Sequence, residues 1–159
     1  TAGDGAPEAW CDGRRLPVSV SLSHRAGRAL AVVAASPDVV GCDLERLEPR
    51  SDAFVRGWLS PSEQAAVRMA GTRQRPLVTN LIWSAKEAST KVRREGLRLP
   101  VQRAVVSIPP APPGDPWRPL AIDWQDGTPP TPGWWRREPA WVMVVAAERE
   151  IIPADHRLQ

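Results

Sequence analysis

The sequence predicts an α+β fold in which an antiparallel sheet packs against two helices. Short apolar runs bounded by Gly, Pro or Asp indicate strands, and two segments with helical spacing carry capping residues. With 42% hydrophobic and 25% charged residues, the 159-residue chain has the composition of one compact domain, residues 1–159.

The first strands form a predicted hairpin. Across Pro17–Ser23, every second residue is apolar and the residues between are serines, which is typical of a half-buried strand. A second apolar run follows at Ala29–Ala35, so we expect a hairpin with His24 at its tip. Taken by itself, His24 there is equally well explained as an exposed turn residue.

A third strand is expected at Val39–Glu45, after a turn at Pro37 and Asp38. Because side chains alternate along a strand, Asp43 and Glu45 point to the same face. The plainest interpretation of that pair is a solvated strand face. Three later strands are expected between proline-rich loops, at Arg103–Ile108, Leu120–Trp124 and Trp141–Ala147.

Both predicted helices have recognisable ends. The first is expected from Ser60 to Met69, because Ser60-Pro61-Ser62-Glu63 has the form of a capping box with proline in the first turn. The second begins at Pro76 and ends at Arg93 and Arg94, with Gly96 just beyond. Its apolar residues recur at helical spacing: Leu77, Leu81, Ala85, Ala88 and Val92.

Composition excludes several classes of protein. No run approaches the ~20 apolar residues of a membrane helix, and no signal peptide is present, so we expect a cytoplasmic protein without a membrane partner. Two cysteines, Cys11 and Cys42, are too few for a disulfide scaffold and lack metal-ligand spacing. A net charge of +3 suits an acidic partner without requiring nucleic acid.

The second helix carries the residues that suggest chemistry. Trp83, Glu87 and Lys91 follow one stripe at i, i+4 spacing. An exposed ion pair is the ordinary explanation of such a Glu and Lys. However, Lys86 and Lys91 are the only lysines in a chain that otherwise uses Arg. Their presence favours a role that needs a compact point charge, such as contact with a phosphate.

Three carboxylates complete the candidate site. Asp43 and Glu45 would repel each other if buried on one strand face, unless a cation lies between them. With Glu87 they form an all-oxygen ligand set that suits Mg²⁺, an ion that shares substrate phosphates.

Four segments, in this order, resemble the surfactin type of 4′-phosphopantetheinyl transferase. They are Ser21-Leu22-Ser23-His24, Gly41-Cys42-Asp43-Leu44-Glu45, Trp58-Leu59-Ser60-Pro61-Ser62-Glu63 and Trp83-Ser84-Ala85-Lys86-Glu87-Ala88-Ser89-Thr90-Lys91. The resemblance covers roughly Gly5 to Ile108. It implies transfer of 4′-phosphopantetheine from coenzyme A to a serine of an acyl or peptidyl carrier protein, with release of 3′,5′-ADP.

The resemblance also implies roles for the matched residues. Asp43, Glu45 and Glu87 would hold Mg²⁺ or Mn²⁺, and Glu87 would act as the general base. Lys91 would contact the phosphate nearest the pantetheine, and His24 would contact the pyrophosphate from the strand side. Ser23 of the first segment would also contact coenzyme A. Lys86 would reach either a phosphate of coenzyme A or a neighbouring carboxylate. Trp83 and Leu81 are expected in the core, as is the side chain of Cys42.

The chain departs from the family at its start. Residues 1–36 match only a remnant of the first of two similar halves, 37–150 match the second half, and 151–159 form a polar tail that includes His156. Where the family shows Gly-Lys/Arg-Pro, two alignments are open. Gly5-Ala6-Pro7 loses the basic residue, whereas Gly13-Arg14-Arg15 offers Arg14 or Arg15 to the nucleotide.

Two explanations of the short first half are open. The chain begins at Thr1 without an initiator Met, which fits a domain of a larger synthase such as a polyketide synthase, completed by a neighbouring segment. Alternatively, it forms a homotrimer like the short holo-synthase type. Acidic carrier proteins would be steered by arginines near the motifs; candidates are Arg25, Arg28, Arg56 and Arg68.

Two other functions remain as alternatives. The first is a non-catalytic half-domain that binds carrier proteins or docks a neighbouring domain, which the short first half favours. The second is a metal-dependent nuclease. Two observations argue against a nuclease: Lys86 directly precedes Glu87, and the net charge is modest for a protein that binds DNA.

Overall fold

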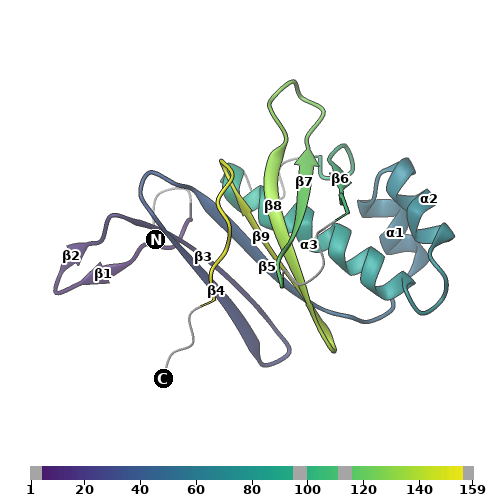
Figure 1. Cartoon of the computed structure of the whole chain (residues 1–159), viewed down its shortest axis with the longest axis horizontal. Helices are drawn as coiled ribbons and strands as arrows, with labels where there is room; N and C mark the ends of the chain where they lie inside the picture. The colour runs from purple at the N-terminus through teal and green to yellow at the C-terminus, as the bar shows by residue number, and fades with distance from the viewer. Residues whose placement is uncertain (1–4, 95–99, 111–115, 156–159) are drawn as a thin grey trace.

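The computed structural model describes residues 5–94, 100–110 and 116–155, and it has the predicted α+β architecture with antiparallel sheets (Figure 1). A five-stranded sheet has the strand order β5-β9-β8-β7-β6. Its strands are β5 (Val40–Arg46), β6 (Val105–Ser107), β7 (Arg118–Asp123), β8 (Thr131–Glu138) and β9 (Trp141–Ala147). Two hairpins stand beside it, β1 (Trp10–Cys11) with β2 (Arg14–Arg15) and β3 (Val18–Arg25) with β4 (Arg28–Ala35).

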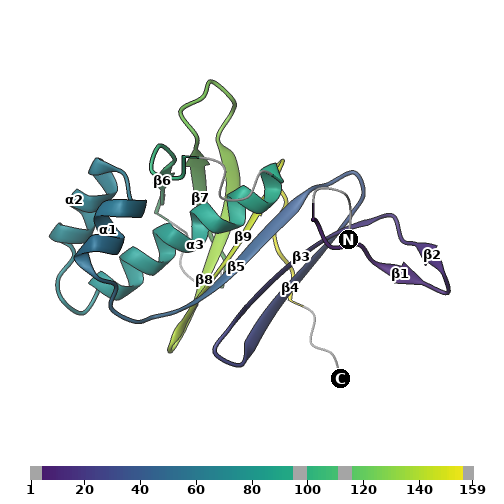
Figure 2. The same cartoon turned by 180° about the vertical axis from the view of Figure 1, so that it is seen from behind.

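Three helices, and not the expected two, are present in the described residues: α1 (Asp52–Trp58), α2 (Pro61–Met69) and α3 (Arg75–Arg93). The long α3 crosses one face of the sheet, and α1 and α2 lie together at one end of it (Figure 2). The capping box of α2 is confirmed, since Ser60 Oγ accepts the Glu63 N–H and Glu63 Oε2 accepts the Ser60 N–H. The short α1 was missed although Ser51 Oγ caps it by accepting the Phe54 N–H.

The placement of His24 at a hairpin tip was wrong. The turn of the β3–β4 hairpin is Ala26-Gly27, and both residues have positive φ, 45° and 79°. This is the backbone that a two-residue hairpin turn needs, and glycine adopts it at little cost. His24 therefore lies inside β3, opposite Ala29.

The second error concerns β8, which was not expected because Pro132 suggested a loop, whereas Pro129 and Pro130 do lie outside any strand. Pro132 lies opposite Ala121 of β7, whereas the pairing of β8 with β9 begins one residue later, at Gly133 and Ala146. Proline has no N–H to donate, but at position 132 this removes no hydrogen bond to β9, because the pairing with β9 has not yet begun. The remaining expected strands are present, and β9 has the expected bounds.

Close packing between α3 and β5 fixes where the candidate residues meet. A Cβ added to Gly41 would lie 2.0 Å from the carbonyl oxygen of Ala88, so only glycine permits this approach. Val40, Cys42 and Leu44 point to the opposite face, where Leu30 and Val32 of β4 cover them. Cys42 is fully buried there, as expected. Gly41, Asp43 and Glu45 consequently face α3.

Candidate active site

Three serines attach β3 to the edge of β5. The hydroxyl oxygens of Ser19, Ser21 and Ser23 accept the N–H groups of Val40, Cys42 and Leu44 at 3.3, 2.9 and 3.2 Å. The serine alternation therefore marks a contact between the hairpin and the sheet, and not a solvent-facing side. Ser23 Oγ also donates to Asp43 Oδ1 at 2.9 Å, so Ser23 holds this carboxylate in place.

Asp43 and Glu87 each present a carboxylate oxygen without a partner. Asp43 is 6% exposed and Glu87 is half-buried, and among the described residues Asp43 Oδ2 and Glu87 Oε1 are buried without any hydrogen bond. Burial raises the pKa of Glu87, and the nearby charge of Asp43 raises it further. Two facing carboxylates with unsatisfied oxygens are a donor set that fits a hard divalent cation.

Glu45 is in a different state although it shares the face of Asp43. Its Oε2 accepts Arg25 Nε at 3.1 Å and an Arg50 guanidinium N–H at 2.7 Å. Its Oε1 accepts the indole N–H of Trp83 at 3.2 Å. Both oxygens are thus engaged by the protein. The described residues accordingly contain no ready-made cluster of three acidic, His or Cys ligands.

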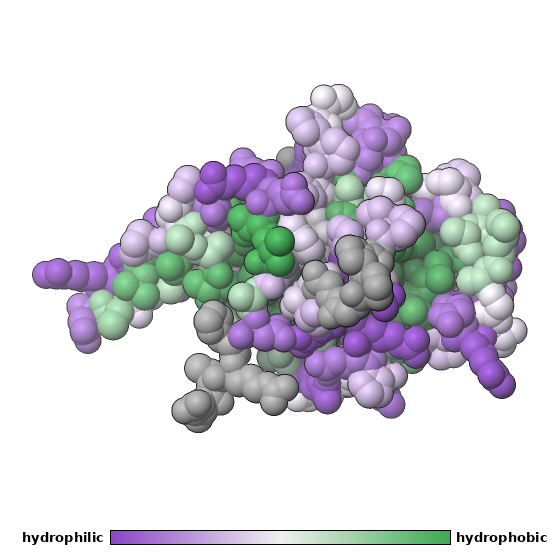
Figure 3. Space-filling model, in the orientation of Figure 1, coloured by the Kyte–Doolittle hydropathy of each residue, from purple (hydrophilic) through white to green (hydrophobic). Residues whose placement is uncertain are grey.

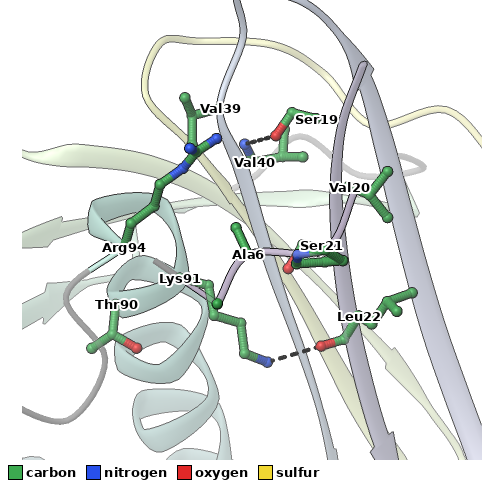
Figure 4. A pocket seen from close by; sticks show the side chains of 12 residues that line it. Ala6, Ser19, Val20, Ser21, Leu22, Val39, Val40, Thr90, Lys91 and Arg94 are labelled. Carbon is green, nitrogen blue, oxygen red and sulfur yellow. Dashed lines mark hydrogen bonds between the residues drawn. The ribbon is translucent and has the colours of Figure 1, made fainter. Parts of the chain in front are cut away.

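Lys91 lies between α3 and the β3–β4 hairpin, and Figure 4 shows its hydrogen bond to Leu22. Its Nζ donates to the carbonyl oxygens of Cys42 at 2.6 Å and Leu22 at 3.3 Å, and it lies 3.5 Å from Asp43 Oδ1. The side chain is 32% exposed. Lys91 therefore offers a fixed positive charge beside Asp43 that a ligand can still reach.

Lys86 is entirely inside the protein. Its Nζ donates to Glu63 Oε2 at 2.6 Å and to the Trp58 carbonyl at 3.1 Å, and the side chain is 0% exposed. Glu63 Oε1 in turn accepts the Val106 N–H. Of the two alternatives for Lys86, the structure thus favours a neighbouring carboxylate. A contact with coenzyme A is not available to it in this position.

The predicted site residues of the hairpins are not all brought together. Because side chains alternate, His24 lies on the face of β3 opposite Ser23 and is exposed. Arg14 and Arg15 lie on β2, where Arg15 pairs with Glu8 at 3.2 Å. None of these three lines the cavity beside Lys91.

That cavity has a volume of about 420 Å³ and is bounded by β3, the start of β5, the end of α3 and Gly5–Pro7. Figure 4 shows Lys91, Arg94 and Ala6 around it. Of the two alternative segments, Gly5-Ala6-Pro7 borders this cavity and Gly13-Arg14-Arg15 does not. The role expected of Arg14 or Arg15 stays a prediction.

Sequence reasoning missed the part played by Arg25, Arg50 and Trp83 around Glu45. Arg50 also donates from Nε to Asn80 Oδ1 at 2.7 Å, so it links the loop after β5 to α3. Trp83 contacts Phe54 and Trp58, as expected of a core residue, yet its indole N–H points to Glu45. The contacts of Arg25 and Trp83 with Glu45 join segments far apart in the sequence, whereas Arg50 is only five residues after Glu45.

Comparison with known proteins supports a family assignment. Residues 39–130 match the family model of the 4′-phosphopantetheinyl transferase superfamily. The match includes Asp43, Glu87 and Lys91. No curated protein matches the chain.

Proposed function

The chain belongs to the 4′-phosphopantetheinyl transferase superfamily, and we propose that it modifies a serine of an acyl or peptidyl carrier protein, with coenzyme A as donor. The observation that carries this proposal is the pair of unpartnered oxygens, Asp43 Oδ2 and Glu87 Oε1, beside the ammonium of Lys91. Most buried polar side-chain atoms are hydrogen-bonded, so two unsatisfied carboxylate oxygens at one place call for a ligand.

Asp43 and Glu87 are the residues that would hold Mg²⁺ or Mn²⁺, with Glu45 close by but already bound to Arg25 and Arg50. When bound, the ion neutralises charge on the diphosphate of coenzyme A as the leaving group departs. Ser23 orients Asp43 through its hydroxyl, and Trp83 and the two arginines fix Glu45.

In the reaction, the serine oxygen of the carrier attacks the phosphorus nearest the pantetheine. The bond from that phosphorus to the bridging oxygen breaks, and 3′,5′-ADP leaves with the bridging oxygen. Glu87 takes the serine proton as the general base. Lys91 places its charge on the phosphate under attack.

The carrier protein is expected to approach over α1 and α2. Of the four candidate arginines, Arg25 pairs with Glu45 and Glu48, and Arg28 pairs with Glu138. Arg56 and Arg68 are exposed on α1 and α2, and Met69 beside Arg68 is 87% exposed. A basic surface with an apolar residue suits an acidic helical carrier.

A neighbouring segment or further copies of the chain would complete the site on the hairpin side. Apolar side chains gather there (Figure 3), and Leu22 and Val33 on β3 and β4 are 56% and 61% exposed. Either a synthase domain or a homotrimer would cover them. We place the reaction in the cytoplasm, with no nucleic-acid or membrane partner. Among the described residues, no helix is long and apolar enough to span a membrane.

The test is intact-mass spectrometry of apo carrier proteins incubated with the chain, coenzyme A and Mg²⁺. We expect a mass gain of one phosphopantetheine that requires Mg²⁺ and is lost in Glu87→Ala and Asp43→Ala. Asp52→Asn, which changes an exposed carboxylate on α1, is the matched control and should retain the gain.

A second readout needs no turnover. Mn²⁺ binding, followed by electron paramagnetic resonance, should be lost in Asp43→Asn and retained in Asp52→Asn. No mass gain across several carriers, or a gain that persists in Glu87→Ala, contradicts the proposal. The first of these results would favour a non-catalytic docking half-domain.

A further inference from the structure

Two arginines hold Glu45, and they differ in how firmly they are fixed. Arg50 is the enclosed one. It donates to Glu45 Oε2 and to Asn80 Oδ1, each at 2.7 Å, and its guanidinium lies 5.0 Å from the ring centroid of Phe54. Its side chain is only 15% exposed, and Asn80 is fully buried. Arg50 is therefore part of the packed structure around α3 and has little freedom to leave Glu45.

Arg25 holds the same oxygen from a more exposed position. Its Nε lies 3.1 Å from Glu45 Oε2, and its side chain is 37% exposed. Another nitrogen of the guanidinium pairs with Glu48 Oε1, and the side chain of Glu48 is equally exposed. Arg25 can consequently release Glu45 and still keep a carboxylate partner near the surface.

Arg25 also lies within the electrostatic reach of Asp43, which offers an oxygen to a cation. It follows Ser23 by two residues on β3, so both side chains point toward β5, and Ser23 donates to Asp43. The hydrogen bond with Glu48 raises the pKa of Arg25, and the charges of Glu45 and Asp43 raise it further. Since the charge of Asp43 acts on Arg25, a divalent ion bound to Asp43 would repel the guanidinium.

Arg25 and a divalent ion would therefore compete for Glu45. An ionised carboxylate has about four acceptor positions. Glu45 uses three of them, for the two arginines and the indole of Trp83. If Arg25 leaves, a position on Oε2 becomes free while the other two partners still orient the carboxylate. Glu45 shares the strand face of Asp43, so the freed position belongs to the side chain next to the candidate ion.

We propose that Arg25 is a positioning residue that withholds Glu45 from the divalent ion and so lowers the affinity of the chain for the metal. While this restraint is in place, Asp43 and Glu87 are the carboxylates that hold the ion. When Arg25 withdraws to Glu48, Glu45 becomes a further ligand. The inference rests on the proposed function and adds a control of metal affinity at the same site.

The first experiment titrates Mn²⁺ into four chains and follows the free ion by electron paramagnetic resonance. They are the wild type, Arg25→Gln, Glu45→Gln and the double variant. Arg25→Gln should bind Mn²⁺ about tenfold more tightly than the wild type, an effect of the size that partners of metal ligands usually have. In the Glu45→Gln background the same change should alter the affinity less than about threefold, because the carboxylate that Arg25 restrains is absent.

The comparison of the two backgrounds separates the restraint from simple charge repulsion. A repulsion between Arg25 and the ion that does not involve Glu45 would act equally in both backgrounds, since independent effects add. Equal gains in affinity in the two backgrounds overturn the inference, and so does the absence of any gain in Arg25→Gln.

Two further variants serve as controls. Arg28→Gln removes a charge at the same end of the hairpin, because Arg28 lies opposite Arg25 and pairs with Glu138 at 2.7 Å. Its affinity for Mn²⁺ should equal that of the wild type. Arg25→Lys keeps a cation beside Glu45 without the planar fork, so its affinity should fall between those of the wild type and Arg25→Gln.

A second measurement needs no change at Glu45, which is buried. Pulsed electron paramagnetic resonance in D₂O counts the water molecules on bound Mn²⁺. Arg25→Gln should have fewer of them than the wild type, because the Glu45 carboxylate takes the place of water. An equal water count in the two chains overturns the inference.

Both measurements are independent of turnover, so the inference and the proposed function can fail separately. If no carrier is modified but Arg25 controls the affinity through Glu45, the proposed function fails and the restraint stands. If carriers are modified while Arg25→Gln leaves the Mn²⁺ affinity and the water count unchanged, the proposed function stands and the restraint fails.

Discussion

The two lysines of the chain lie five residues apart on α3 and have opposite surroundings. Lys86 is sealed between α2 and α3, with Glu63 and the Trp58 carbonyl as partners. Lys91 is one-third exposed and faces Asp43 beside a cavity. Burial lowers the pKa of Lys86, and Glu63 opposes that effect. The two lysines therefore have different roles although they are the same residue type. The role of each depends on the groups that surround its ammonium.

The largest expected effect is the loss of stability in Lys86→Ala. Its removal leaves the Glu63 carboxylate buried without its cation, which costs about 3–5 kcal/mol. For a chain of this length, that corresponds to a fall in Tm of about 10 °C, measured by circular dichroism. If Lys86→Ala is as stable as the wild type, the pair of Lys86 and Glu63 does not stabilise the fold.

A double variant serves as the control. Lys86→Met combined with Glu63→Gln removes both charges and keeps similar volumes, so it should be more stable than Lys86→Ala by roughly half of the loss. Recovery stays incomplete because Glu63 accepts N–H groups from Ser60 and Val106 on separate oxygens, and an amide has only one acceptor oxygen.

The second prediction concerns Lys91→Ala, which should lower activity strongly and stability little, the reverse of what is expected of Lys86→Ala. Its kcat/KM for carrier modification should fall about 100-fold, the loss expected of roughly 2.7 kcal/mol of transition-state stabilisation. Its Tm should change by less than about 4 °C, since the side chain is partly solvated and donates mainly to backbone carbonyls. Mass-spectrometric time courses measure the rate.

The matched variant is Lys91→Arg, which keeps the charge but not its compact shape. It should recover part of the activity and all of the stability. A Tm loss in Lys91→Ala as large as that in Lys86→Ala would contradict the division of roles between the lysines.

Local patterns predicted the elements that are stabilised locally. The capping box at Ser60 and Glu63 foretold the start of α2, and helical spacing foretold α3. The order of motifs placed Asp43, Glu87 and Lys91 together, and the fold brings them to adjoining faces of β5 and α3. These successes depend on interactions within a few residues, or on segments that pack directly.

Long-range contacts account for the failures. Glu45 looked equivalent to Asp43 on the strand, but Arg25 arrives from β3 and Arg50 from the following loop. The burial of Lys86 depends on α1 and α2 covering α3, and α1 was not anticipated. Similarly, Pro132 is acceptable in β8 only because of the register with β9. Apart from the contact between Glu45 and Arg50, which are five residues apart, none of these facts is visible in a local window.

The smallest expected effect tests whether the charge of Glu87, on the side of α3 that carries Lys91, lowers the stability of the fold. The pKa of Glu87 is raised above its ordinary value of 4.5 by burial and by Asp43 and Glu45, while Lys91 opposes this. The folded chain thus holds the Glu87 proton to a higher pH than the unfolded chain. As pH rises through the interval between the two pKa values, the folded state loses stability.

Glu87→Gln carries no such charge, so the metal-free variant should melt about 2–4 °C above the wild type at pH 7, and the two should converge below about pH 4. Mg²⁺ should raise the Tm of the wild type and leave that of Glu87→Gln nearly unchanged, because only the carboxylate can supply a charged ligand. Scanning calorimetry at both pH values, with and without the ion, measures these differences. If Glu87→Gln is less stable than the wild type at pH 7, Glu87 stabilises the fold as Glu63 does. The contrast between the structural surroundings of Lys86 and the site around Lys91 would then not hold.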